Sequence, residues 1–156
     1  MIEHQAMVNL LISVNDKIIC DLPPTFSLLA VTTIAFDIAG LELLGPLLQG
    51  ARVVLATSKD ATDPKRLSLL LEQHNIDCMQ ATPATWELLV SSDWSGHKNL
   101  TILAGGDVLP INLARQLLTK CQQLWNCYGP TEASVWSLIK SIDIDDLMLV
   151  NVPIGG

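Results

Sequence analysis

The sequence is poor in charged residues and in aromatic ones other than tryptophan. Of its 156 residues, 16% are charged and 49% are hydrophobic, with a formal net charge of −7 and a single tyrosine. Ordinary domains contain about 25% charged residues at a similar apolar share. Nine lysines and arginines are too few to form a basic face that neutralises phosphates or an anionic lipid surface. We therefore expect neither a nucleic acid nor a membrane as a partner.

Signals for metal binding, disulfides and export are also missing. The four cysteines form no CxxC pair and have no histidine at a metal-ligand spacing, which predicts neither a zinc site nor a disulfide framework and fits a cytoplasmic location. The first residues lack the basic and apolar regions of a signal peptide. The most apolar stretch, 28–48, contains Asp37 and Glu42, and a charge inside a bilayer costs about 2.5–3.5 kcal/mol. We interpret that stretch as buried protein.

Four common signatures are absent: GxxxxGK[ST], GxGxxG, HExxH and GxSxG. Their absence argues against a Walker-type phosphate loop, a dinucleotide-binding fingerprint, a zinc protease and a serine hydrolase. The three histidines are scattered along the chain.

The pattern of apolar residues predicts strands that alternate with helices. The predicted strands are 28–33, 52–56, 78–81, 100–104, 124–128 and 135–142. The predicted helices are 38–48, 64–74, 82–90 and 110–120. Such alternation is typical of an α/β protein with a mostly parallel sheet and helices on its faces. Ligands of these sheets bind at the carboxyl ends of the strands, where segments 36–38, 105–107 and 126–132 fall.

Asp37 lies among apolar neighbours, where a carboxylate is costly to bury unless a cation or strong donors meet it. A bound ammonium group would satisfy it, and the alternative is an N-cap of the following helix. Trp136 allows two interpretations as well, as a core residue or as the wall of a pocket.

Two further segments could contact a planar, phosphorylated ligand. Gly105 and Gly106 would let the backbone approach it closely, or form a plain tight turn. Tyr128 could stack on a base, while Thr131 and Glu132 suit a phosphate and Mg²⁺. The alternative there is a Gly-Pro turn with exposed polar residues.

Residues 126–132 (NCYGPTE) closely resemble the NxYGPTE motif of adenylation domains of nonribosomal peptide synthetases, which belong to the adenylate-forming superfamily. Segments 29–38 (LAVTTIAFDI), 79–86 (MQATPATW) and 104–107 (AGGD) follow the family's pattern in the same order. The resemblance covers nearly the whole chain. It implies that residues 1–156 are the central part of the large subdomain of an AMP-binding domain.

The resemblance also implies roles for individual residues. Tyr128 would stack on adenine, Thr131 would contact the α-phosphate, Glu132 would hold Mg²⁺, and Asp37 would pair with the ammonium group of an amino acid. The implied nucleotide-binding residues are Gly105, Gly106, Asp107, Asn126, Tyr128, Gly129 and Thr131. The implied amino-acid pocket consists of Asp37, Ile38, Leu41, Gln80, Leu103, Gly105, Cys127, Val135 and Trp136. This second set is similar to the family's glycine-selecting combination, and the tryptophan leaves little room for a larger substrate.

The implied reaction joins an amino acid to the AMP part of ATP and releases pyrophosphate. The aminoacyl group would then pass to the phosphopantetheine thiol of a carrier domain in a multidomain synthetase with condensation domains. The family's phosphate loop would precede Met1, its lysine-bearing subdomain would follow Gly156, and segment 16–27 fits the family poorly. We therefore expect the isolated chain to be inactive. The alternative is a non-catalytic remnant or interaction module that keeps the fold.

Overall fold

A six-stranded sheet forms the centre of the protein. The computed structural model describes residues 3–149 and 151–155. The strands are β1 (Ser27–Ala30), β2 (Arg52–Leu55), β3 (Cys78–Ala81), β4 (Thr101–Gly105), β5 (Gln123–Tyr128) and β6 (Leu138–Ile142). They lie in the order β2-β1-β3-β4-β5-β6. Neighbouring strands run parallel except β6, which is antiparallel to β5. The predicted mostly parallel sheet is confirmed.

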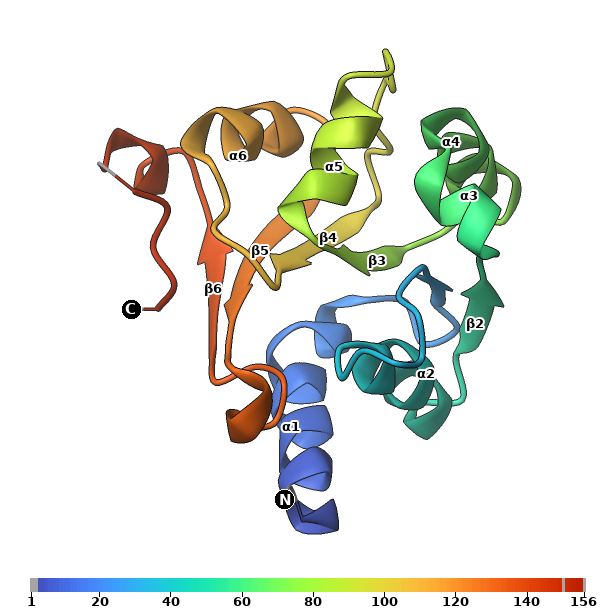
Figure 1. Ribbon diagram of the computed structural model, residues 1–156, viewed down its shortest axis with the longest axis vertical. Coiled ribbons are helices and arrows are strands. Elements are labelled where there is room, and N and C mark those ends of the chain that lie inside the picture. Colours follow the sequence, from blue (N-terminus) through green and yellow to red (C-terminus); the bar gives the residue numbers. More distant parts are fainter. Residues whose placement is uncertain (1–2, 150, 156) are drawn as a thin grey trace.

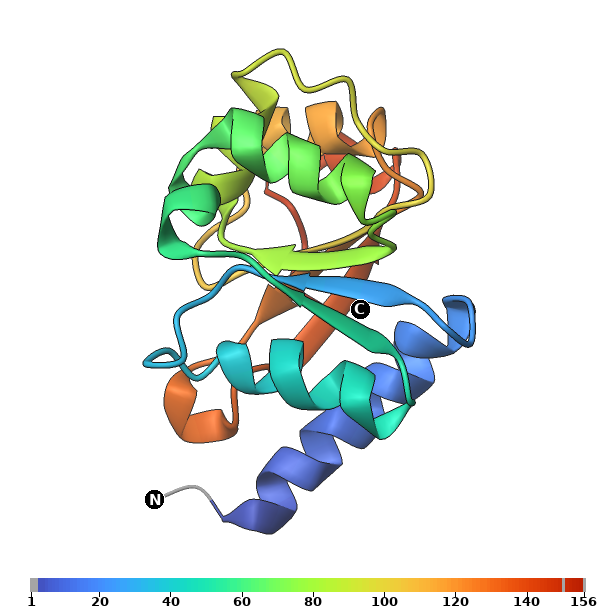
Figure 2. The same ribbon diagram turned by 90° about the vertical axis from the view of Figure 1, so that its right-hand side faces the viewer.

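Helices cover both faces of this sheet. The α-helices are α1 (His4–Lys17), α2 (Ala39–Leu48), α3 (Ser58–Thr62), α4 (Pro64–Gln73), α5 (Pro83–Val90) and α6 (Ile111–Leu118). Short 3₁₀ helices are η1 (Ile19–Asp21), η2 (Thr131–Ala133) and η3 (Asp146–Met148). α4, α5 and α6 lie on one face, and α1 and α2 lie on the other (Figures 1 and 2). The result is the α/β layering that the alternating pattern predicts.

Each face of the sheet has its own hydrophobic core. On the side of α4, α5 and α6, Trp86 is fully buried and its ring centroid lies 6.3 Å from that of Trp94. On the side of α1 and α2, the core contains Phe26, Leu41 and Trp136. Most of the amino-acid pocket implied by the family resemblance therefore lies in this second core.

Capping side chains explain where two of the helices begin. The Asp63 carboxylate accepts hydrogen bonds from the backbone N–H groups of Lys65 and Arg66, and Pro64 is the first residue of α4. The Thr82 hydroxyl accepts one from Thr85 at the start of α5. Both arrangements leave fewer unpaired donors in the first helical turn.

The N-cap interpretation of Asp37 is wrong. The residue that precedes α2 is Ile38, and no side chain caps this helix in the part of the chain that the structure describes. Asp37 contributes its backbone carbonyl, which accepts a hydrogen bond from Gly40. The residue is half-buried, and its carboxylate takes no part in starting the helix.

Two strands, β1 and β6, are shorter than the sequence pattern predicts by two residues or more. β1 ends at Ala30 because the backbone N–H groups of Val31 and Thr32 donate to the side chain of Glu42 instead of to a strand. β6 begins at Leu138 because Ser134 and Val135 both adopt the left-handed conformation, with φ of 64° and 69°. α1 and α3 were not predicted.

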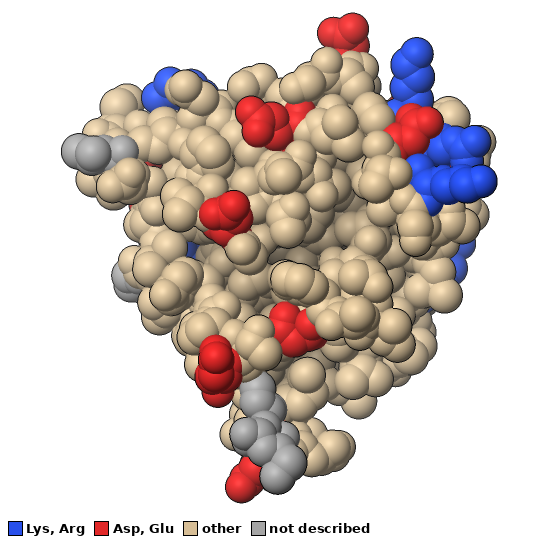
Figure 3. Space-filling view, in the orientation of Figure 1, with Lys and Arg blue, Asp and Glu red and all other residues tan. Residues whose placement is uncertain are grey.

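Charged side chains are sparse on the surface. On the face shown in Figure 3, most acidic residues lie singly among uncharged ones, and most of the basic residues in view gather, next to an acidic one, at the edge near α3 and α4. None of the helices within the described residues is long and apolar enough to cross a membrane.

Candidate functional site

A cleft of about 380 Å³ opens beside the carboxyl ends of β4 and β5. Five of its lining residues are Gly106, Asp107, Asn126, Tyr128 and Gly129. These two strands are parallel neighbours, so the segments that follow them meet at one edge of the sheet. The structure thus brings together five of the seven predicted nucleotide-binding residues.

The cleft offers an aromatic ring and a closely approachable backbone. Tyr128 ends β5 and keeps 51% of its surface exposed, so its ring is free to stack on a planar ligand. Gly106 has a φ of +83°, which a residue with a side chain adopts only at a cost. The Asn126 amide donates to the carbonyl of Pro153 at 2.9 Å and so holds the C-terminal segment against the cleft.

Thr131 and Glu132 lie in η2, just beyond Tyr128, and both are exposed. The lining of the cleft includes neither of them. Within the described residues, no group of three or more His, Cys, Asp or Glu side chains could hold a metal ion by itself. A single exposed carboxylate fits Mg²⁺ that is held mainly by nucleotide phosphates, because this ion commonly takes only one or two protein carboxylates.

The predicted amino-acid pocket is a nearly closed cluster. Its residues come from the segment before α2, from α2, from β3, β4 and β5, and from the turn before β6. All of them are buried except Asp37, which is half-buried. Burial, with Cys78 nearby, raises the pKa of the Cys127 thiol, so this group is neutral and behaves as an apolar wall.

Trp136 closes over Gly105 in this cluster. A Cβ atom on Gly105 would lie 2.5 Å from Cη2 of the Trp136 ring and 2.6 Å from the carbonyl oxygen of Cys127. Gly105 therefore has no side chain because the tryptophan ring and a neighbouring strand occupy that space. The Trp136 side chain is only 6% exposed, so the ring is both part of the core and a wall of the cluster.

Gln80 joins the tryptophan to α2 through hydrogen bonds. The Trp136 indole Nε1–H donates to Gln80 Oε1 at 2.8 Å. Gln80 Nε2 donates to the carbonyl of Ile38 at 3.1 Å and to Glu42 Oε1 at 3.2 Å. A buried amide needs such partners, because an unpaired polar group costs about 1–3 kcal/mol.

Glu42 is the residue that the sequence analysis missed. Its side chain is fully buried and accepts four hydrogen bonds, from Val31, Thr32 (backbone and hydroxyl) and Gln80. Burial raises the pKa of Glu42 above its usual value, against the lowering effect of these hydrogen bonds. The signal in the sequence was an acidic residue on the apolar side of a predicted helix.

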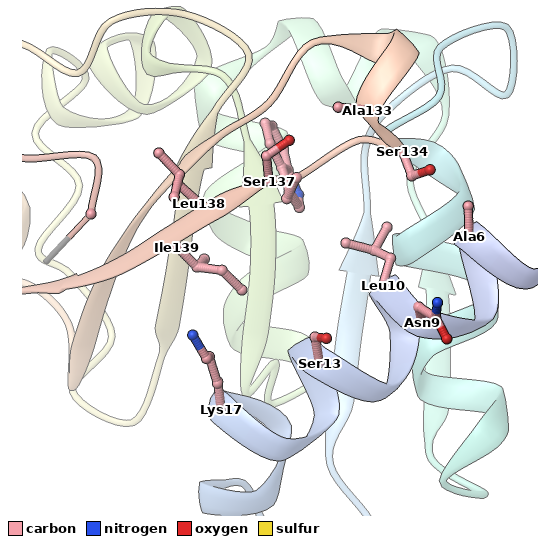
Figure 4. A pocket seen from close by; sticks show the side chains of 12 residues that line it. Ala6, Asn9, Leu10, Ser13, Lys17, Ala133, Ser134, Ser137, Leu138 and Ile139 are labelled. Carbon is pink, nitrogen blue, oxygen red and sulfur yellow. The ribbon is translucent and has the colours of Figure 1, made fainter.

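A second cavity, of about 440 Å³, lies between α1 and the segment 133–139. Figure 4 shows Asn9, Leu10 and Ser13 of α1 facing Ser134 and Ser137 across it. Of the predicted site residues, it is lined by Trp136 alone. The larger volume therefore does not mark the predicted site, which is divided between the cleft and the buried cluster.

Comparison with known proteins gives a consistent result. The AMP-binding enzyme family model matches residues 1–155. A dimodular nonribosomal peptide synthase of Bacillus subtilis (strain 168) is 38% identical over 137 residues, which cover 88% of this chain and 6% of that protein. A solved four-domain nonribosomal peptide synthetase bound to AMP and glycine is 42% identical, with a TM-score of 0.88 over 99% of this chain and 12% of its own.

A solved synthetase protein with adenylation and PCP domains is 31% identical, with a TM-score of 0.75 over 85% of this chain and 23% of its own. The chain therefore spans only a small part of the relatives that it matches. The family model, the relatives and the shared fold all agree with the motif at 126–132. The chain belongs to the AMP-binding enzyme family, and it is part of an adenylation domain of the kind found in nonribosomal peptide synthetases.

Proposed function

We propose that this chain forms the nucleotide-binding and amino-acid-binding part of an adenylation domain that activates glycine or another small amino acid. In the proposed reaction the carboxylate of the amino acid attacks the α-phosphate of ATP, and aminoacyl-AMP and pyrophosphate form. The solved synthetase bound to AMP and glycine, 42% identical to this chain, supports both the nucleotide and the small substrate.

The contact between Trp136 and Gly105 carries the proposal for a small substrate. The ring fills the space that a Cβ on Gly105 would occupy, and its hydrogen bond to Gln80 fixes its orientation. Between α1 and three walls of the cluster, Leu41, Gln80 and Leu103, the core encloses only about 10 Å³ of empty space, too little for more than one water molecule, so these walls have no larger void to retreat into. Each methylene group forced into such a packed site costs about 1–3 kcal/mol.

Each remaining group has a proposed task. The carboxylate of the half-buried Asp37 would pair with the ammonium group of the amino acid, and Tyr128 would stack on adenine. Thr131 would donate its hydroxyl hydrogen to the α-phosphate. Glu132 would help to hold Mg²⁺, which when bound neutralises charge on the phosphates. A phosphopantetheine thiol on a carrier domain, in the cytoplasm, would receive the aminoacyl group.

The test uses a complete adenylation domain, because the matched relatives are much longer than this chain. Residues 1–156 replace the corresponding segment of the synthetase that is 42% identical over 99% of the chain; we call this protein the grafted domain. Amino-acid-dependent pyrophosphate exchange is measured with glycine, alanine, leucine and phenylalanine. We expect glycine to be preferred, alanine to be about ten- to a hundredfold poorer, and the larger two to be hardly used.

The Trp136→Ala variant of the grafted domain provides the matched comparison. Removal of the ring opens space beside Gly105, so we expect the preference to move toward alanine or larger substrates. A grafted domain that prefers leucine or phenylalanine would contradict the proposal, as would a Trp136→Ala variant with unchanged preference. Folding of both proteins is checked by their thermal unfolding transitions.

A further inference from the structure

Glu42 contacts neither the cleft nor the solvent, yet it is hydrogen-bonded to one residue of the predicted amino-acid pocket, Gln80, and to the segment that leads from β1 to another, Asp37. We propose that Glu42 is a positioning residue of this pocket: its carboxylate fixes both the segment that carries Asp37 and, through Gln80, the ring of Trp136. This inference rests on the proposed function. It assigns control of amino-acid affinity and of side-chain selection to a residue outside the predicted pocket.

One set of hydrogen bonds joins Glu42 to the segment after β1. Glu42 Oε2 accepts hydrogen bonds from the backbone N–H groups of Val31 and Thr32 at 2.9 and 3.0 Å. Glu42 Oε1 accepts one from the Thr32 hydroxyl at 2.5 Å. These three bonds turn the chain away from the sheet and into residues 33–38. The path of the backbone toward Asp37 therefore starts from a point fixed on α2.

A second set of hydrogen bonds joins Glu42, through Gln80, to Trp136 on the other side of the pocket; the two sets together are called the network below. Glu42 Oε1 and the carbonyl of Ile38 both accept hydrogen bonds from the Gln80 amide nitrogen. This arrangement leaves the Gln80 carbonyl oxygen facing the Trp136 indole, from which it accepts a bond at 2.8 Å. If the Gln80 amide were reversed, two N–H donors would face each other at Trp136. Glu42 thus selects the orientation of Gln80 that holds the ring.

A carboxylate suits this position better than any other side chain. Four donors converge on its two oxygens, and an ionised carboxylate accepts at both, whereas the amide of a glutamine has one acceptor and one donor group. In a Glu42→Gln variant at least one NH₂ group therefore faces the donors of Val31, Thr32 or Gln80. The change alters no atom that would touch the amino acid or ATP, which separates positioning from direct contact.

The experiment measures kcat and KM of the grafted domain for glycine, alanine and ATP by pyrophosphate exchange. In the Glu42→Gln variant we expect the KM for glycine to rise about tenfold or more, since misplacement of a binding group is costly. We expect the KM for ATP to change less than about twofold. The preference for glycine over alanine should fall, because the Trp136 ring is held less firmly. A uniform loss of binding would instead affect all substrates alike and leave the preference unchanged. Glu87→Gln on the exposed side of α5 is the matched control and should leave every value unchanged.

A double substitution separates positioning from general stability. If Glu42 acts on the tryptophan through Gln80, the Glu42→Gln/Gln80→Leu protein loses no more selectivity than Gln80→Leu alone. Thr32→Ala, which removes one hydrogen bond and little volume, is the milder variant; it should raise the KM for glycine and keep the selectivity.

A measurement that needs no activity uses ¹⁵N-tryptophan-labelled grafted domain. We expect hydrogen exchange of the Trp136 indole N–H to be slow in the original protein and at least about tenfold faster in Glu42→Gln. The tenfold factor corresponds to a weakening of the hydrogen bond between Trp136 and Gln80 by about 1.4 kcal/mol. A Trp136→Phe protein assigns the signal.

The two proposals fail in different ways. If the unsubstituted grafted domain shows no preference for a small amino acid, the proposed function is wrong, and the indole exchange rate still tests the network. If that preference is present but Glu42→Gln behaves like Glu87→Gln in both kinetics and exchange, the positioning role is wrong. Additive losses of selectivity in the double variant would also overturn it.

Discussion

Adding one methyl group at Gly105 tests the packing of the amino-acid pocket directly. The new Cβ would lie 2.5 Å from the Trp136 ring, nearly 1 Å short of the 3.4 Å at which ordinary contact begins. The ring has little freedom to retreat, because it is 6% exposed and hydrogen-bonded to Gln80. The carbonyl oxygen of Cys127, at 2.6 Å, belongs to a neighbouring strand and cannot rotate away.

Overpacking of this kind typically costs about 1–3 kcal/mol. For a chain of this length each kcal/mol lowers the Tm by about 2–4 °C, so Gly105→Ala should lower the Tm by about 2–12 °C. Thermal unfolding of the 156-residue chain, followed by circular dichroism, measures the shift. Gly155→Ala is the matched control, because the Cβ there would meet Leu138 at an ordinary 3.5 Å.

Combination with Trp136→Ala shows which contact is responsible. In that background the methyl group should cost less, because the ring is gone, but not nothing, because the Cys127 carbonyl stays. A Gly105→Ala chain as stable as the original would refute the closed packing, and with it the main structural argument for a small substrate.

Three further outcomes are expected. In the grafted domain, Tyr128→Ala should raise the KM for ATP about tenfold or more, since stacking on an aromatic ring contributes about 1–3 kcal/mol, while Tyr128→Phe should keep it; an unchanged KM in the alanine variant would remove the stacking assignment. In the 156-residue chain, Asp63→Ala should lower stability by about 1 kcal/mol, because the N–H groups of Lys65 and Arg66 lose their cap; urea unfolding at neutral pH measures it, and no loss would contradict the cap. Because the pKa of Glu42 is raised in the folded state above its usual 4.5, its contribution to stability is complete below that pH and falls as pH rises through the folded-state value. The free energy of unfolding of the original chain minus that of the Glu42→Gln chain should therefore decrease as pH rises above 4.5. An increase in this difference would mean that folding lowers the pKa of Glu42 and would contradict the prediction.

Local patterns in the sequence were enough to predict most of the sheet and the helices that pack on it. Asp63 followed by Pro64 marks the start of α4 correctly because capping depends on neighbouring residues alone. The end of β1 could not be predicted in this way. It depends on Glu42, which comes 12 residues after Ala30 in sequence and accepts hydrogen bonds from the next two backbone N–H groups only in the folded chain.

The site shows the same division between local and long-range information. The positive φ of Gly106 and the exposed ring of Tyr128 agree with what their segments predict. The need for a glycine at position 105 could not be inferred from the neighbouring residues in the sequence. The group that fills the space of a Cβ there is the ring of Trp136, which comes from a different part of the chain. Ser134 and Val135, which precede that tryptophan, both have left-handed backbone conformations. This conformation could not be predicted either, because a β-branched residue such as Val135 rarely adopts it.

The hydrogen bonds from Glu42 through Gln80 to Trp136 bear on how such a pocket could change during evolution or by engineering. A single exchange of any of the three leaves a buried donor or acceptor without a partner, so an intermediate protein is less stable than either parent. A block that runs from the end of β1 to Trp136 contains the whole network and every predicted pocket residue of this chain. Recombination with boundaries outside this block would transfer a specificity intact, whereas boundaries between Glu42 and Trp136 would separate partners that need each other.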